Sequence, residues 1–106
     1  MNGGACRYDI MTSYMIIEPR EVWDPKKYGE YCSKVPAVVE RFGGRYLARD
    51  MSPYHINGNW HPSKVVIIEF PSREKFDAWW NSPEYRALAP LRELSAEVNA
   101  VLVSSP

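Results

Sequence analysis

The side chains best suited to proton transfer at neutral pH are the two histidines of this sequence. His55 and His61 flank the turn-forming pair Asn57-Gly58. We consider His61, which lies between Trp60 and Pro62, a candidate catalytic acid or base, because imidazole exchanges a proton near neutral pH. The alternative favoured by the pattern is a loop histidine that orders the turn.

Arginines form a second candidate group. Arg45 and Arg49 are four positions apart in a segment typical of a strand, so we expect both side chains on one face of a sheet. A guanidinium group can bind a substrate carboxylate through two parallel hydrogen bonds. We therefore name Arg49, together with His61, as a candidate catalytic residue. Arg45 and Arg92 are candidate ligand-binding residues. An ion pair, for example of Arg45 or Arg49 with Glu69, is the favoured alternative.

Aromatic residues are the third group, since the chain has four Trp, seven Tyr and three Phe. Trp60, Trp80 and Tyr85, with Glu69, complete the candidate ligand-binding set, because aromatic walls with a few polar groups suit small organic ligands. Core packing is the alternative, and it is the stronger interpretation for Trp79. Tyr28 and Tyr31 belong to the apolar stripe of a predicted helix, and we expect their hydroxyls to reach the rim of the same ligand pocket.

Several functional classes lack their sequence signals. The histidines and cysteines are not spaced as in metal sites, and Gly43-Gly44 lacks the spacing of phosphate-binding loops, so we expect no metal and no cofactor. Basic and acidic residues number 13 each, which does not favour a nucleic acid or a membrane as partner. Cys6 and Cys32 are expected to be free thiols, and we expect a cytoplasmic protein.

Hydrophobic patterns predict four strands, over residues 14–18, 45–51, 64–70 and 99–103. Pro19 is expected to end the first strand. The strand 64–70 is apolar at consecutive positions, which indicates burial on both faces. Asn57-Gly58 predicts a turn that pairs the second and third strands.

Helices are predicted where a capping residue precedes or follows proline. Asp24-Pro25 begins the first helix, which Pro36 should kink or split and Gly43-Gly44 should end. Ser72 begins the second helix, and Ser82-Pro83 begins a new helical segment.

The resulting order, β-α-β-β-α-β, predicts an α+β ferredoxin-like fold with a four-stranded antiparallel sheet and helices on one face. The uncovered sheet face then needs a second subunit, so we expect a homodimer. Residues 13–106 form the single predicted domain. Residues 1–12 are predicted to be a flexible extension, and Met11 is an alternative natural start.

Several segments together resemble a known family: Asp24-Pro25 with Val35-Pro36, FGGRYLAR at 42–49, NGNWHPSKVVIIEFPS at 57–72 and WWNSPEYRALAPLR at 79–92. They are similar to the bacterial domain-of-unknown-function family 1330, within the dimeric α/β-barrel superfamily. The resemblance covers about Tyr14 to Val103 and implies a ferredoxin-like protomer whose sheet packs on that of a second copy. It implies no settled reaction, because the superfamily includes cofactor-free oxygenases, isomerases and ligand-binding domains. The chain departs from the family at Asp50, where members often have glycine.

Three hypotheses for function remain. The first is a small cofactor-independent enzyme that acts on a small organic acid or aromatic compound, and it predicts a pocket that reaches His61, Arg45 or Arg49. The second is a non-catalytic module that binds a small ligand, which needs the pocket but no acid or base. The third is a structural dimer, which predicts a filled interior.

Overall fold

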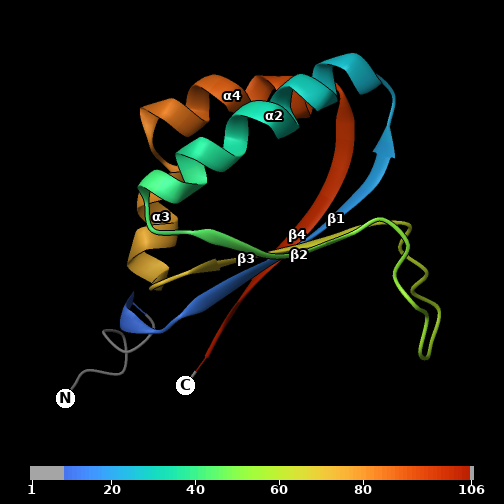
Figure 1. Ribbon diagram of the computed structural model, residues 1–106, viewed down its shortest axis with the longest axis horizontal. Coiled ribbons are helices and arrows are strands. Elements are labelled where there is room, and N and C mark those ends of the chain that lie inside the picture. The colour runs from blue at the N-terminus through green and yellow to red at the C-terminus, as the bar shows by residue number, and fades with distance from the viewer. Residues whose placement is uncertain (1–8, 106) are drawn as a thin grey trace.

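The computed structural model describes residues 9–105, which form a sheet covered by helices on one face (Figure 1). The elements in chain order are β1 (Ser13–Val22), α2 (Pro25–Arg41), β2 (Arg45–Asp50), β3 (Val65–Phe70), α3 (Arg73–Trp80), α4 (Pro83–Glu93) and β4 (Ala96–Ser104). The predicted flexible extension, residues 1–12, falls largely outside the described residues.

The sheet has the order β2-β3-β1-β4, and all neighbouring strands are antiparallel. Helices α2, α3 and α4 lie on the same side of it (Figure 1). The predicted ferredoxin-like arrangement is therefore confirmed, with the second helix divided into α3 and α4. We call the sheet face that carries no helix the outer face.

Side-chain caps start the three helices where the sequence predicts them. Asp24 accepts a hydrogen bond from the backbone N–H of Lys27 (3.1 Å), and Ser72 accepts one from Lys75 (3.0 Å). Ser82 accepts the backbone N–H of Tyr85 (3.1 Å) and starts α4 directly after α3. Each cap satisfies an amide that has no partner inside its helix.

The prediction that Pro19 ends the first strand was wrong, and so was the alternative that Pro36 splits the first helix, whereas a kink at Pro36 stays a prediction. Pro19 does not end β1, which continues to Val22. The pairing of β1 with β3 extends only to Ile17, so no hydrogen bond to β3 is lost at Pro19. Against β4, the missing N–H of Pro19 falls where β1 shifts register. Pro36 does not split α2, which is assigned as one helix from Pro25 to Arg41. Buried valines on both sides of Pro36 anchor the helix to the core and offset the lost backbone bond.

A β-bulge in β2 overturns the prediction that Arg45 and Arg49 share a face. Tyr46 pairs with Ile68, but Ala48 pairs with the adjacent Ile67, so Leu47 is an extra residue. The alternation of side chains is therefore inverted after Leu47. Arg49 lies on the helix-covered face with Tyr46, and Arg45 lies on the outer face.

The core lies between the sheet and the helices. Val39, Phe70, Trp79 and Tyr85 are fully or almost fully buried there. The turn after α2 brings the backbone close to this core: Gly43 has φ 81°, and a Cβ on Gly44 would lie 2.6 Å from a methyl of Val39. Glycine at these positions therefore lets the chain enter β2 against the core.

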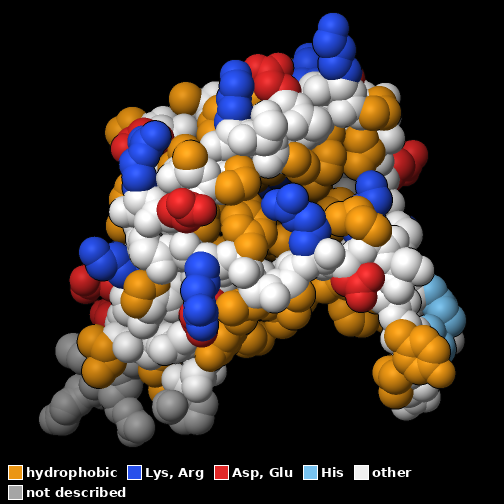
Figure 2. All heavy atoms as spheres, viewed as in Figure 1, with side chains coloured by type: hydrophobic (Ala, Val, Ile, Leu, Met, Phe, Trp, Pro, Cys, Tyr) orange, Lys and Arg blue, Asp and Glu red, His pale blue; other side chains and the backbone are white. Residues whose placement is uncertain are grey.

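The outer face carries apolar side chains that no helix covers. Val101 is 59% exposed and Val103 46% exposed, and Ile16 and Ile67 are partly exposed beside them. Residues 51–64, which we call the hairpin arm, connect β2 to β3 and project beyond the sheet (Figure 1). The arm and the sheet frame a hollow whose surface is largely apolar (Figure 2).

Candidate functional site

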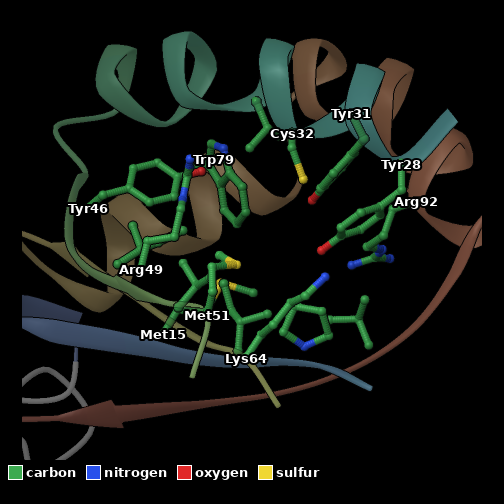
Figure 3. A pocket seen from close by; sticks show the side chains of 16 residues that line it. Met15, Tyr28, Tyr31, Cys32, Tyr46, Arg49, Met51, Lys64, Trp79 and Arg92 are labelled. Atoms are coloured by element: carbon green, nitrogen blue, oxygen red, sulfur yellow. The ribbon is translucent and has the colours of Figure 1, made fainter. Parts of the chain in front are cut away.

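A cavity of about 300 Å³ lies between the helix-covered face of the sheet and the helices. Its floor consists of alternate residues of the strands, and α2 supplies much of its roof (Figure 3). The lining residues with apolar contact surfaces include Met15, Ile17, Val35, Met51, Val66, Ile68, Trp79 and Val98. A volume near 300 Å³ lies at the lower end of the range for small-molecule sites.

Positive charge distinguishes this cavity. Arg49, Lys64 and Arg92 line it, and none of its described lining residues is acidic. Within residues 9–105, no carboxylate lies within ion-pair distance of Arg49 or Lys64, while Arg92 Nη2 lies 3.4 Å from Glu93 Oε2. The cavity is therefore a cationic site with apolar walls.

Aromatic rings hold the two guanidinium groups at this cavity. Arg49 lies over the ring of Tyr46, 5.0 Å from its centroid, and Arg92 lies 5.5 Å from the ring centroid of Trp80. Such cation–π contacts orient a guanidinium group and leave the N–H donors in its own plane available to a ligand.

Tyrosine hydroxyls supply neutral donors to the same space. Burial raises the pKa of Tyr28 and of Tyr31 well above the usual range, and it raises the pKa of Tyr46 to about 12. The Tyr31 hydroxyl hydrogen-bonds that of Tyr85 (2.8 Å). Burial also raises the pKa of the Cys32 thiol, so the thiol remains protonated at neutral pH and is a poor nucleophile.

The structure brings together part of the candidate set. Arg49 and Arg92 both line the cavity, and Tyr85 and Trp80 lie behind it in an aromatic cluster with Trp79. Tyr85 is fully buried and does not line the cavity, so it can act on a ligand only through its hydrogen bond to Tyr31.

The remaining candidates lie elsewhere. Arg45 Nε and Glu69 Oε1 form an ion pair of 2.8 Å on the outer face, which is the alternative that the sequence favoured for this arginine. Trp60 and His61 belong to the hairpin arm and line the outer-face hollow. The structure therefore places His61 and Arg49 in different hollows on opposite faces of the sheet.

The two histidines pack on each other within the hairpin arm. Their rings stack with centroids 3.9 Å apart, and His55 Nε2 hydrogen-bonds the carbonyl oxygen of Gly58 (2.8 Å). Gly58 has φ 85°, as a tight turn at Asn57-Gly58 requires. These contacts support a role of the histidines in ordering the turn.

Sequence reasoning missed Lys64 and Tyr46. Lys64 has the parity of Val66 and Ile68, two inward residues of the following strand, and that parity could have indicated its direction. Tyr46 had no such signal, because only the bulge at Leu47 brings Arg49 to the same face of the sheet as Tyr46.

The described residues offer neither a metal site nor a membrane-spanning helix. In residues 9–105, no group of three or more His, Cys, Asp or Glu side chains is placed to hold a metal ion. Over the same residues, no helix is both long and apolar enough to cross a bilayer.

Comparison with known proteins places the chain in a family. The model described as "Domain of unknown function (DUF1330)" matches residues 12–106. The chain belongs to the DUF1330 family. The resemblance seen in the sequence is thereby confirmed, and the DUF1330 description assigns no reaction. Among curated proteins, no significant match was found.

Solved structures similar to this DUF1330 chain share its fold. RPA0582, a protein of unknown function from Rhodopseudomonas palustris, has a TM-score of 0.74 at 20% identity, over 92% of this chain and 84% of that one. SnoaB, a cofactor-independent oxygenase from Streptomyces nogalater, has a TM-score of 0.66 at 11% identity, over 91% and 94%. A dimeric ferredoxin-like protein of unknown function from Thermobifida fusca has a TM-score of 0.55 at 14% identity, over 92% and 94%. At these identities the likeness concerns the fold alone.

Proposed function

We propose that this protein binds a small organic acid with an apolar or aromatic body in the cavity under α2. The observation that carries the proposal is the lining of that cavity. Arg49, Lys64 and Arg92 project into a largely apolar space to which the described residues contribute no carboxylate.

The physical argument concerns compensation of charge. Positive groups at an apolar wall lose part of their hydration, and a bound anion restores favourable interactions. Arginine offers a planar pair of donors that matches a carboxylate, and the neutral tyrosine hydroxyls can donate further hydrogen bonds. The apolar walls then gain from contact with the body of the same ligand.

A second candidate function is catalysis on such an acid without a cofactor. The observation that favours it is the group of buried, protonated tyrosines at the cavity, whose hydroxyls can donate hydrogen bonds to a developing oxyanion. The similarity in fold to SnoaB is compatible with this candidate. Turnover of a bound acid would favour the enzyme, and binding without turnover would favour the binding module.

Calorimetric titration with benzoate and with benzamide tests the proposed ligand class. The two probes have the same ring, but only benzoate carries a charge, so we expect benzoate to bind at least about tenfold more tightly. Because the raised pKa values keep the cavity's tyrosines and Cys32 protonated, the affinity should be constant from about pH 6 to about pH 8. Equal binding of the two probes would contradict recognition of an anion.

We further propose that the outer face joins two copies of the chain. The exposed valines of β4, the isoleucines of β1 and β3 and the apolar hairpin arm form one surface on this side of the sheet. An exposed apolar surface of this kind is typical of a subunit contact. The Thermobifida fusca protein with the same fold is described as dimeric.

Sedimentation velocity tests the dimer. The wild-type protein should sediment with twice the mass of the chain, and Val101→Lys should sediment as a monomer, because it places a charge in the contact. Leu94→Lys is the matched control, since Leu94 is 63% exposed at the end of α4 and away from the outer face. A monomeric wild type, or a dimer that Val101→Lys leaves intact, would contradict the proposed interface.

A further inference from the structure

Two of the three cationic groups of the cavity, Arg49 and Arg92 of helix α4, lie at opposite edge strands of the sheet. Arg49 belongs to β2, one edge strand, while Arg92 lies beside Val98 and Ala100 of β4, the other edge strand. Figure 3 shows Arg49 and Arg92 on opposite sides of the cavity, with both apolar and polar lining side chains between them. Neighbouring strands are about 4.8 Å apart, so three spacings separate the edge strands by about 14 Å.

Both guanidinium groups lie against aromatic rings. Arg49 stacks on Tyr46, and Arg92 lies over the Trp80 ring, 5.5 Å from its centroid. Tyr28, Tyr31 and Tyr46 line the same cavity, so phenol hydroxyls are available to an acidic group beside the arginines.

The acidic neighbour of Arg92 does not neutralise the cavity end. Glu93 is largely exposed and is not among the residues that line the cavity, and ion pairs at exposed positions are weak. The side chain of Arg92 is only 17% exposed. Its charge is thus more buried than that of its partner, and it remains available to a ligand.

A single carboxylate leaves one end of this arrangement without compensation. The lining has three cations and no acid, so a monoacid bound at Arg49 leaves the Arg92 end of the cavity without an anion. A second acidic group at the far end of the same ligand would complete the match of charge.

We propose that the cavity recognises a dicarboxylic acid whose two acidic groups lie at opposite ends of an apolar or aromatic body, one at Arg49 and the other at Arg92. This inference rests on the proposed binding of organic acids and names the class within it. Lys64 contributes positive charge to the cavity, which favours a dianion further.

Calorimetry with three aromatic acids tests the inference. Terephthalate carries carboxylates at opposite ends of a ring, phthalate carries them on adjacent carbons, and benzoate carries one. We expect terephthalate to bind at least about tenfold more tightly than either benzoate or phthalate. Phthalate controls for total charge, because it has the charge of terephthalate without the separation.

Two arginine variants locate the second end. Arg92→Met should reduce the affinity for terephthalate to about that for benzoate, and should change benzoate binding by less than about threefold. Arg86→Met is the matched control, because Arg86 also lies on α4 and over the Trp80 ring (4.8 Å) but does not line the cavity. It should leave all three affinities unchanged, and thermal unfolding checks that each variant folds.

The outcomes separate the two proposals. Benzoate binding as tightly as terephthalate would overturn the diacid inference and leave the binding of organic acids standing. Phthalate equal to terephthalate, or Arg86→Met as harmful as Arg92→Met, would also overturn the diacid inference. No binding of any of the three acids at millimolar concentration would overturn the proposed function itself.

Discussion

Replacing Arg49 with methionine is expected to weaken benzoate binding by about 10- to 100-fold. A hydrogen bond to a charged group contributes about 1.5–3 kcal/mol, and each 1.4 kcal/mol corresponds to a factor of ten in affinity. Arg49 is the anchor expected for a monoacid, because no carboxylate of the described residues lies within ion-pair distance of it and its guanidinium group lies against the Tyr46 ring. Methionine keeps the apolar stem and removes the charge.

Arg45→Met is the matched control for this prediction. Arg45 lies on the same strand and carries the same charge, but its side chain pairs with Glu69 on the outer face. Its replacement should leave benzoate affinity unchanged in the same titration. If Arg45→Met weakened binding as much as Arg49→Met, overall charge rather than the cavity would explain the affinity.

The second large effect is expected in the core, where Ile68→Ala should lower the free energy of unfolding by about 2–5 kcal/mol. Ile68 is 2% exposed and faces the helices from β3, between β1 and β2. Truncation leaves a space that its neighbours cannot fill, because β3 is paired on both sides and cannot shift. Urea unfolding measured by tryptophan fluorescence gives the value.

Ile67→Ala provides the comparison, at the adjacent position of the same strand. The sequence alone predicts the same cost for both isoleucines, since both belong to one apolar run. In the structure Ile67 lies on the outer face and is only partly buried in the protomer, so in the monomeric Val101→Lys background its truncation should cost about 1 kcal/mol. A larger loss for Ile67→Ala than for Ile68→Ala would place the main core on the outer face and contradict the assigned layers.

The local chemistry of the chain predicted much of this fold. Asp24, Ser72 and Ser82 cap helices because a side-chain oxygen before a helical segment satisfies its first amides wherever it occurs. Short runs of apolar residues predicted the strands, and the order of elements predicted the sheet. Proline was less reliable, because Pro36 remains inside a helix that tertiary packing holds together.

The candidate site was predictable only in part. Arg49 and Arg92 were identified by the chemistry of their side chains, and both line the cavity. Their separation from Arg45 and His61 depends on long-range contacts: one extra residue at Leu47 inverts the faces of β2, and the hairpin arm carries His61 to the other side of the sheet.

Sequence by itself thus determined which elements form, in which order they pair, and which residue types could bind an anion, because capping, periodicity and side-chain charge act over a few neighbouring positions. Tertiary structure alone decided which of these residues share a space. A bulge adds one residue to a strand and moves each following side chain to the opposite face of the sheet, although the composition of the strand is unchanged. Whether a cavity stays empty depends on how the side chains of distant elements fit together.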